Sequence, residues 1–162
     1  GGTTHLNPGV YYLENADFDA QGGTITGTGV TIILTGNNPG TIKTNGNATI
    51  QLTAPTATTC ASSLNGTNSC NYQNMLIIQS TNATDSNSAN NTINGSSSSF
   101  FDGAFYFPNQ QLNFTGSSGN MTKCAMIVAR RVQFSGNANI QNNTTGCTAN
   151  TQVTGWEIRL IA

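Results

Sequence analysis

Two strand-like runs meet at a glycine corner in Thr24-Ile25-Thr26-Gly27-Thr28-Gly29-Val30-Thr31-Ile32-Ile33-Leu34. The β-branched residues on both sides favour extended strands. Glycine accepts backbone conformations that other residues avoid, so the Gly-x-Gly unit indicates an abrupt change of chain direction. The corner could close a hairpin of antiparallel strands, or it could carry the chain from one coil of a solenoid to the next.

The spacing of the apolar clusters favours the solenoid. The central residues Tyr12 and Ile33 are 21 residues apart, and Tyr106 and Ile127 are also 21 apart. The remaining gaps are 44, 29 and 32 residues, which requires insertions. The clusters are Tyr11–Leu13, Ile32–Leu34, Leu76–Ile78, Phe105–Phe107, Met126–Val128 and Ile158–Leu160.

A repeat of about 20 residues with glycine and asparagine corners is typical of a parallel β-solenoid. We therefore predict an all-β, single-stranded parallel β-solenoid (β-helix) of about five to six coils, in which stacking at about 4.8 Å builds the core. Ile32–Leu34 should then pair in parallel with Tyr11–Leu13 and with Leu76–Ile78. No segment keeps a 3.6-residue period, so we expect little or no helix. A β-sandwich or jelly roll is the competing fold, and antiparallel pairing would support it.

The irregular gaps place the insertions at residues 55–74, 81–90, 115–123 and 141–151, before a last strand at Trp156–Ile161. No linker or change of composition divides the chain, so residues 1–162 should form one solenoid domain. We expect this domain to be a fragment or processed part of a longer exported protein.

The charge content excludes several classes of partner. Only 7% of the residues are charged and the net charge is −1. Nucleic acids and anionic membranes require a basic surface, so neither is expected as a partner. The sequence also lacks a run of 18 apolar residues that could span a membrane.

The four cysteines fit an oxidising compartment. Cys60 and Cys70 bracket a loop-like stretch, and Cys124 and Cys147 border polar segments. We expect disulfides between Cys60 and Cys70 and between Cys124 and Cys147, which implies an extracytoplasmic location: the cell surface, the periplasm or the medium. Four reduced, incidental cysteines are the alternative.

The acidic residues offer one candidate metal site. Asp17 and Asp19 should share one face of a strand while Phe18 points into the core, and Glu14 lies nearby. This set is a weak candidate for Ca²⁺, because Ca²⁺ prefers six to eight oxygen ligands. Solvated surface carboxylates are the simpler interpretation. Asp85 and Asp102 are expected as separate surface residues in polar loops.

The sequence provides little for catalysis. Some parallel β-helices cleave glycans, and glycoside hydrolysis needs two carboxylates flanking one bond. With six acidic residues and one histidine, His5, expected to be inert in an N-terminal polar lead, such a site is hard to assemble. Adjacent Arg130 and Arg131 should mark a corner of the coil. We therefore expect no enzyme activity and no cofactor, with a glycan lyase or hydrolase as a distant alternative.

Outward side chains suggest a binding role. Thr24-Ile25-Thr26 and Thr49-Ile50-Gln51 place polar groups on both sides of an inward isoleucine. Flat rows of hydroxyls could bind carbohydrate or order water as an ice-binding surface does, although threonine also simply suits strands. The aromatic residues outside or beside the clusters could form an exposed row for sugars or a partner, or serve the core; they are Tyr72, Phe100, Phe101 and Trp156.

A succession of motifs resembles the C-terminal extracytoplasmic β-helix region of TadG-like proteins, which are associated with Tad/Flp pilus assembly in bacteria. The likeness extends from residue 6 to about residue 140. The motifs are Leu6–Tyr12, Gly27–Gly36, Ile50–Thr56, Asn91–Gly95, Gly103–Gln110, Cys124–Ala129 and Phe134–Asn137. The opening Leu6–Tyr12 and the threonine-rich coils are also similar, more weakly, to microbial ice-binding β-solenoids.

The resemblance implies a structural or adhesion protein of the cell exterior that serves a pilus. Its partners would be other proteins of the pilus or cell surface, with self-association through the solenoid ends as a further expectation. The family has no catalytic residues to carry over to this chain. A carbohydrate- or ice-binding module is the alternative function.

Overall fold

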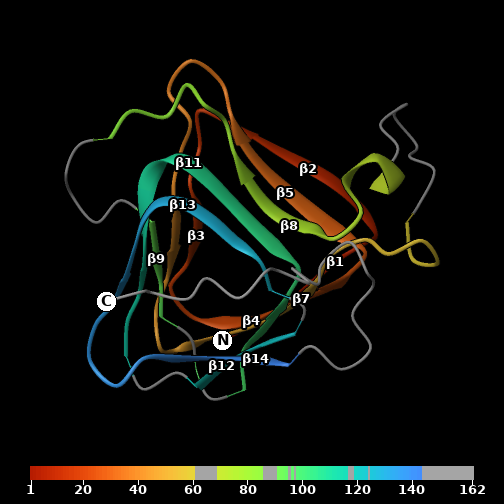
Figure 1. Ribbon diagram of the computed structural model, residues 1–162. Coiled ribbons are helices and arrows are strands. Elements are labelled where there is room, and N and C mark those ends of the chain that lie inside the picture. The colour runs from red at the N-terminus through yellow and green to blue at the C-terminus, as the bar shows by residue number, and fades with distance from the viewer. Residues whose placement is uncertain are drawn as a thin grey trace, which may run out of the picture.

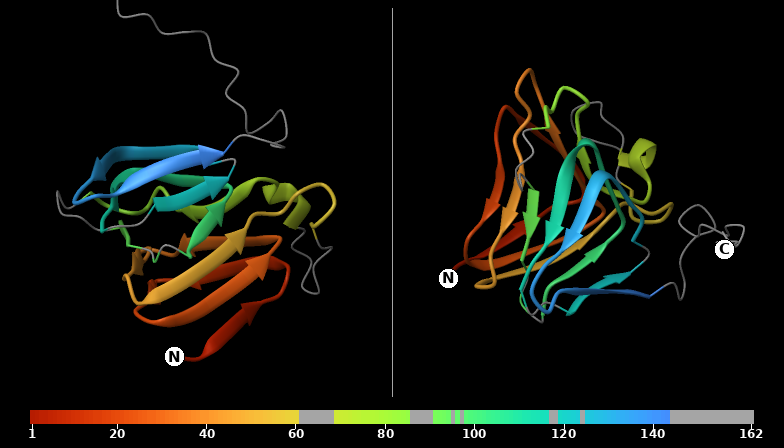
Figure 2. Two further views of the ribbon diagram at one scale, coloured as in Figure 1. Left: turned by 90° about the horizontal axis from the view of Figure 1, so that it is seen from below. Right: turned by 60° about the vertical axis from the view of Figure 1, so that its left-hand side comes forward.

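The computed structural model describes residues 1–60, 69–85, 91–94, 96, 98–116, 119–123 and 125–143, with backbone only at 119–123 and 139–143. It is a β-solenoid of about five turns in which every strand pair is parallel (Figures 1 and 2). The strands are β1 (Thr3–Leu6), β2 (Gly9–Glu14), β3 (Phe18–Ala20), β4 (Gly23–Thr28), β5 (Val30–Thr35), β6 (Ile42–Thr44), β7 (Ala48–Thr53), β8 (Met75–Gln79), β9 (Asn91–Ile93), β10 (Phe100–Asp102), β11 (Ala104–Phe114), β12 (Gly119–Lys123), β13 (Ile127–Phe134) and β14 (Asn139–Asn143).

The coils stack into three faces, which Figure 1 shows along the solenoid axis. The first face consists of β1, β4, β7, β10, β12 and β14. The second face consists of β2, β5, β8 and the first halves of β11 and β13. The third face consists of β3, β6, β9 and the second halves of β11 and β13. Strands β11 and β13 therefore pass through the corner between the second and third faces without a break.

The predicted parallel pairing around Ile33 is confirmed. Ile33 lies opposite Tyr12 on one side and Ile78 on the other. This arrangement excludes the sandwich, which needs antiparallel partners. The clusters of the third and fourth coils stack one residue out of the expected alignment, with Ile77 opposite Phe105. The third cluster is offset in the same way from the second, with Ile32 opposite Ile77. A bulge at Leu76 of β8, between the pairs Met75–Ala104 and Ile77–Phe105, accompanies the shift against β11.

The glycine corner turns the chain from the first face to the second. Gly29 has φ +72°, a conformation that side chains disfavour. A Cβ at this position would lie 2.6 Å from the backbone oxygen of Thr59. The corner therefore depends on glycine for its conformation and for the approach of the residue 55–74 segment.

Inward side chains from all three faces form one apolar core. Phe105 is fully buried between Phe101 and Phe114, with edge-to-face ring distances of 5.8 and 6.4 Å. Such contacts contribute beyond simple area burial. The other fully buried large side chains are Phe107, Ile32, Leu34, Ile42, Ile50, Leu52, Leu76, Ile77 and Ile93.

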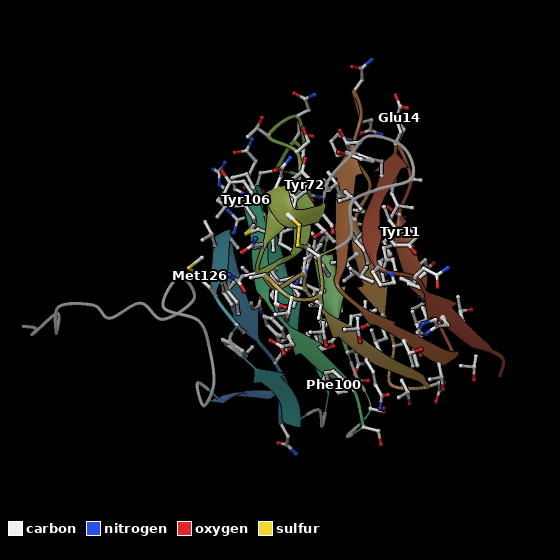
Figure 3. All side chains as sticks on the ribbon, turned by 90° about the vertical axis from the view of Figure 1, so that its right-hand side faces the viewer. Tyr11, Glu14, Tyr72, Phe100, Tyr106 and Met126 are labelled. Carbon is white, nitrogen blue, oxygen red and sulfur yellow. A yellow bond between two sulfur atoms is a disulfide. The ribbon has the colours of Figure 1, made fainter. Side chains whose placement is uncertain are left out.

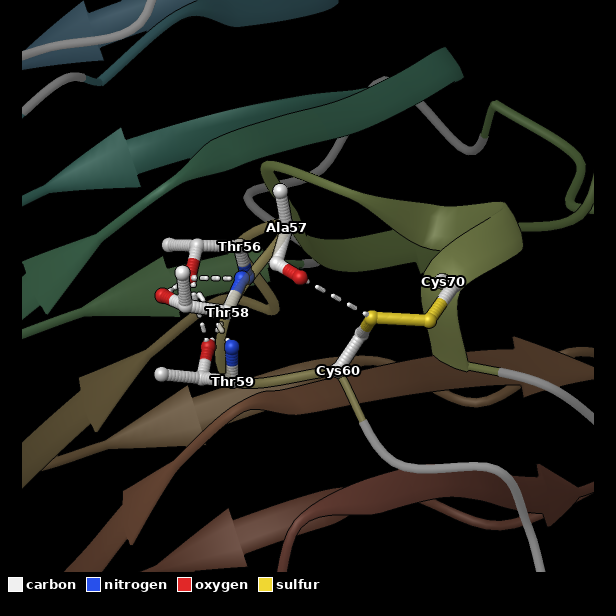
Figure 4. Close-up of a disulfide and its surroundings, with 6 residues drawn as sticks. All are labelled: Thr56, Ala57, Thr58, Thr59, Cys60 and Cys70. Carbon is white, nitrogen blue, oxygen red and sulfur yellow. Dashed lines mark hydrogen bonds between the residues drawn. A yellow bond between two sulfur atoms is a disulfide. The ribbon is translucent and has the colours of Figure 1, made fainter.

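The 55–74 insertion carries the expected Cys60–Cys70 disulfide, with the two Cα atoms 4.9 Å apart (Figure 4). Its described part includes a short 3₁₀ helix, η1 (Ser69–Tyr72). Cys124 and Cys147 lie outside the described residues. No helix among the described residues is long and apolar enough to span a membrane.

The prediction of insertions at residues 115–123 and 141–151 was partly wrong, because both segments contain strand residues. Residues 115–123 include β12, and residues 141–151 begin within β14. These strands are rich in Asn and other polar residues and lack the apolar alternation that identifies a strand in sequence. Parallel pairing with β10 organises β12 instead, and β14 pairs with β12.

Candidate binding faces

The outward side chains of the first face form a regular polar grid. β4 and β7 pair over six consecutive residues without a bulge. Ile50 and Leu52 are fully buried, so their neighbours in β7 point outward. The outward groups repeat about every 6.6 Å along a strand and about every 4.8 Å across strands. They are Thr24, Thr26 and Thr28 on β4, beside Thr49, Gln51 and Thr53 on β7.

Several hydroxyls of this grid are available to a ligand. Within the described part of the chain, Thr24, Thr28 and Thr53 make no side-chain hydrogen bond. Thr26 Oγ1 lies 2.9 Å from His5 Nδ1. Gln51 donates from Nε2 to the Ser98 backbone oxygen at 3.1 Å, which leaves its carbonyl oxygen as an acceptor. The grid therefore offers both donors and acceptors.

One aromatic ring lies on the same face. Phe100 is 37% exposed and pairs with Gln51, whereas neighbouring Phe101 is fully buried. His5, Thr26, Gln51 and Phe100 lie opposite one another on successive strands, and we call them the central row. Figure 3 shows Phe100 well apart from Tyr72 and Tyr106. The four predicted aromatics thus do not form one row, and Trp156 lies outside the described residues.

The second face carries an outward apolar row. Tyr12, Ile33, Ile78, Tyr106 and Val128 lie opposite one another on five successive strands. Tyr12 at one end is 51% exposed and Val128 at the other end is 42% exposed, but Ile33 is only 8% exposed. The exposed apolar ends of this row suit contact with another protein.

The disulfide-linked segment covers part of this row, and η1 packs against β5. Thr31 is fully buried beside η1, and its hydroxyl donates to the backbone oxygen of Met75 in the neighbouring strand β8 at 2.8 Å. The hydroxyls of Tyr12 and Tyr72 lie 3.4 Å apart, and this hydrogen bond, together with burial, raises the pKa of Tyr72. The covering segment therefore bonds to the face beneath it.

A polar hollow lies at the corner between the second and third faces. Its volume is about 390 Å³, and its walls include Asn15, Asp17, Lys43 and Gln110. Asp17 accepts from Lys43 Nζ at 2.7 Å and from the Thr41 backbone N–H at 2.7 Å. The Lys43 hydrogen bond lowers the pKa of Asp17, and the same contact raises the pKa of Lys43.

The candidate calcium ligands do not gather. Among the described residues, no group of three or more His, Cys, Asp or Glu side chains is placed to hold a metal ion. Asp17 is paired with Lys43, Asp19 contacts Gln21, and Glu14 is exposed at the end of β2. The carboxylates of Asp17 and Asp19 therefore serve separate local contacts.

The prediction that Asp85 and Asp102 are surface residues in polar loops was partly wrong, because Asp85 lies in a loop but is buried and Asp102 lies in a strand. The Asp85 side chain is only 7% exposed and pairs with Arg130 Nε at 3.0 Å and with a terminal nitrogen of Arg131 at 2.8 Å. Asp102 is a half-buried residue of β10. The corner predicted at Arg130-Arg131 is confirmed, because β13 turns there between two faces. His5, expected in a polar lead, belongs to β1.

Sequence reasoning missed a buried polar network at this corner. Gln79 donates to Gln110 Oε1 at 2.8 Å, and Asn91 donates to the same oxygen at 2.9 Å. Asn91 Oδ1 in turn accepts the Ile42 backbone N–H at 3.0 Å. The available signal was a glutamine at a core-facing position, directly after the apolar run Leu76–Ile78.

The chain finds no match among protein-family models, curated proteins or solved structures.

Proposed function

We propose that this chain is a non-enzymatic adhesion module of the cell exterior that binds an ordered polar surface through its first face. The observation that carries the proposal is the unbroken register of β4 and β7, which presents two triplets of polar side chains, five threonines and one glutamine, as a regular grid. Carbohydrate polymers and ice both offer repeating hydroxyl or water positions that such a grid can match.

The chemistry of threonine supports this role. A hydroxyl both donates and accepts hydrogen bonds, as sugar hydroxyls and water do. The β-branched side chain has restricted rotation, so little conformational entropy is lost when a ligand binds. The grid is built from strands of the rigid solenoid, which keeps its groups in place before binding.

The acidic residues support a non-enzymatic role. Glycan hydrolysis needs a protonated carboxyl and a second carboxylate facing the same bond. Asp17 is paired with Lys43, and Asp85 is paired with two arginines. The Lys43 hydrogen bond lowers the pKa of Asp17 and so opposes the protonated form that a general acid needs.

The Cys60–Cys70 disulfide supports an extracytoplasmic location, because disulfides persist mainly in oxidising compartments.

Binding to insoluble material tests the proposal. The purified protein should be retained by at least one of cellulose, chitin, cell-wall peptidoglycan or ice. The triple variant Thr24→Val, Thr28→Val, Thr53→Val removes three hydroxyls at nearly constant shape and should lose most of this retention. The matched control Thr35→Val, Thr81→Val, Thr92→Val changes threonines outside the first face. Absence of retention, or equal loss in both variants, contradicts the proposal.

A protein partner from a Tad-type pilus is the second candidate. The apolar row on the second face favours it, and the sequence resemblance to TadG-like proteins suggests the partner. Here Val128→Asp should abolish binding of the purified pilin subunit, while the threonine triple variant should keep it. Failure of the unsubstituted protein to bind pilin would remove this candidate.

A further inference from the structure

Phe100 interrupts the polar grid of the first face with an exposed aromatic ring. It is the fourth member of the central row, after His5, Thr26 and Gln51. Its neighbour Phe101 fills the core, so the strand already supplies a buried aromatic residue at this level. The outward ring is not needed for packing of the core.

The exposed ring distinguishes between carbohydrate and ice, the two ligand classes that the polar grid alone could bind. A phenyl ring offers no hydrogen bond, so it breaks a lattice of hydroxyls that would order water. A sugar ring presents C–H groups on its faces and hydroxyls at its edge. An aromatic ring beside hydrogen-bonding groups matches both parts of a sugar.

The polar surroundings of Phe100 fit the edge of such a sugar. Gln51 lies directly opposite and keeps its carbonyl oxygen as an acceptor. Thr53 lies on the same outward side of β7 with a hydroxyl that makes no side-chain hydrogen bond within the described residues. From His5 to Phe100 the central row extends about 14 Å across the strands, which is enough for more than one sugar unit.

The charge of this face favours a neutral ligand. Asp102 and Lys123 lie opposite each other in register on β10 and β12, so their formal charges cancel. Thr24, Thr26, Thr28, Thr49, Gln51 and Thr53 carry no charge. A strongly anionic glycan would find no excess of positive charge here.

We propose that Phe100, Gln51 and Thr53 form a subsite for one ring of a neutral polysaccharide, in which the sugar stacks on Phe100 and its hydroxyls bond to Gln51 and Thr53. This inference rests on the proposed function and narrows its ligand to a neutral glycan.

Affinity measurements with Phe100 variants test the subsite. The probes are cellulose, xylan and chitin as neutral glycans, with alginate as an anionic comparison and ice as a non-sugar surface. Phe100→Ala should weaken binding to the neutral glycan by about tenfold. Phe100→Tyr should retain binding, because the ring is kept. Val128→Ala removes apolar surface from the second face and should leave binding unchanged.

A spectroscopic readout separates stacking from a general structural effect. Phe100→Trp places an indole at the subsite, and its emission should shift to shorter wavelength when a soluble oligosaccharide of the bound glycan is added. The same addition should cause no shift in Val128→Trp. Thermal unfolding of each variant checks that the fold is intact.

The possible failures are distinct. If the unsubstituted protein binds none of the glycans and no ice, the proposed function and the subsite are both overturned. If the unsubstituted protein binds only ice or alginate, the subsite alone is overturned. The subsite alone is also overturned if Phe100→Ala binds the neutral glycan normally while the threonine triple variant does not. Loss of binding in Phe100→Ala together with retention in Phe100→Tyr supports the subsite.

Discussion

At the scale of single residues, the Gly29 corner gives a sharp prediction. Alanine at this position would adopt φ +72° and would bring its Cβ within 2.6 Å of the Thr59 oxygen. Gly29→Ala should therefore lower the free energy of unfolding by about 1–3 kcal/mol. Gly22→Ala is the matched control, since an added Cβ there meets nothing within 4 Å. Denaturant unfolding of both variants checks the prediction, and equal stability would contradict it.

The Asp17–Lys43 pair predicts a dependence of stability on pH. The folded pKa of Asp17 lies below its ordinary value of 3.8, so this contribution is present above pH 3.8 and is lost as the pH falls through the folded pKa. The folded pKa of Lys43 lies above 10.5, so its contribution is present below pH 10.5 and is lost as the pH rises through the folded pKa. Both side chains are partly exposed, so the effect on stability is small.

An NMR titration of the Asp17 carboxyl group tests this pair. Lys43→Met should raise the pKa of Asp17 toward 3.8, because the largest cause of the shift is removed. Arg130→Gln, which changes a cation paired with Asp85 instead, should leave the Asp17 pKa where it is. An unchanged Asp17 pKa in Lys43→Met would show that the ion pair does not form in solution.

At the scale of elements, the disulfide holds the segment that covers the second face. The variant Cys60→Ser, Cys70→Ser keeps Cys124 and Cys147 and opens a loop closed over a sequence separation of 10. We expect a loss of about 2–3 kcal/mol in unfolding free energy. Release of the segment should also uncover Thr31 and Ile33 and increase binding of a hydrophobic dye. Unchanged thermal unfolding and dye binding would show that the segment stays in place without the disulfide.

Elements with strong apolar patterns could be predicted from the sequence, and the polar ones could not. The Ile32–Leu34 strand was recognised because it belongs to a continuous run of β-branched and apolar residues, but β12 and β14 lack such a run. Phe100 and Phe101 were equivalent in sequence. Only the register opposite buried Leu52 places Phe101 in the core and Phe100 on the surface.

At the scale of the whole molecule, the repeat predicted the stacking of coils, but contacts between distant segments remained hidden. Asp85 meets Arg131 across 46 residues of sequence. No local pattern in the sequence marks that contact, because two further strands on each face separate the two residues along the chain. The polar grid could be predicted from the sequence, because Thr24, Thr26, Thr49 and Gln51 flank inward isoleucines.

The distribution of burial among the coils predicts unequal local stability. In a solenoid each coil contacts only its neighbours, so an outer coil can open while inner coils stay folded. Among the strands of the first coil, only Ala20 is buried, whereas five of the six residues of β5 are buried between neighbours on both sides. Native-state hydrogen exchange should therefore be fast in β1–β3 and slowest in β5, β7 and β8. The unfolding free energy derived from β5 amides should equal the global value, while that from β1 should fall several kcal/mol below it. Equal protection in β1 and β5 would mean that all the coils open together as one cooperative unit.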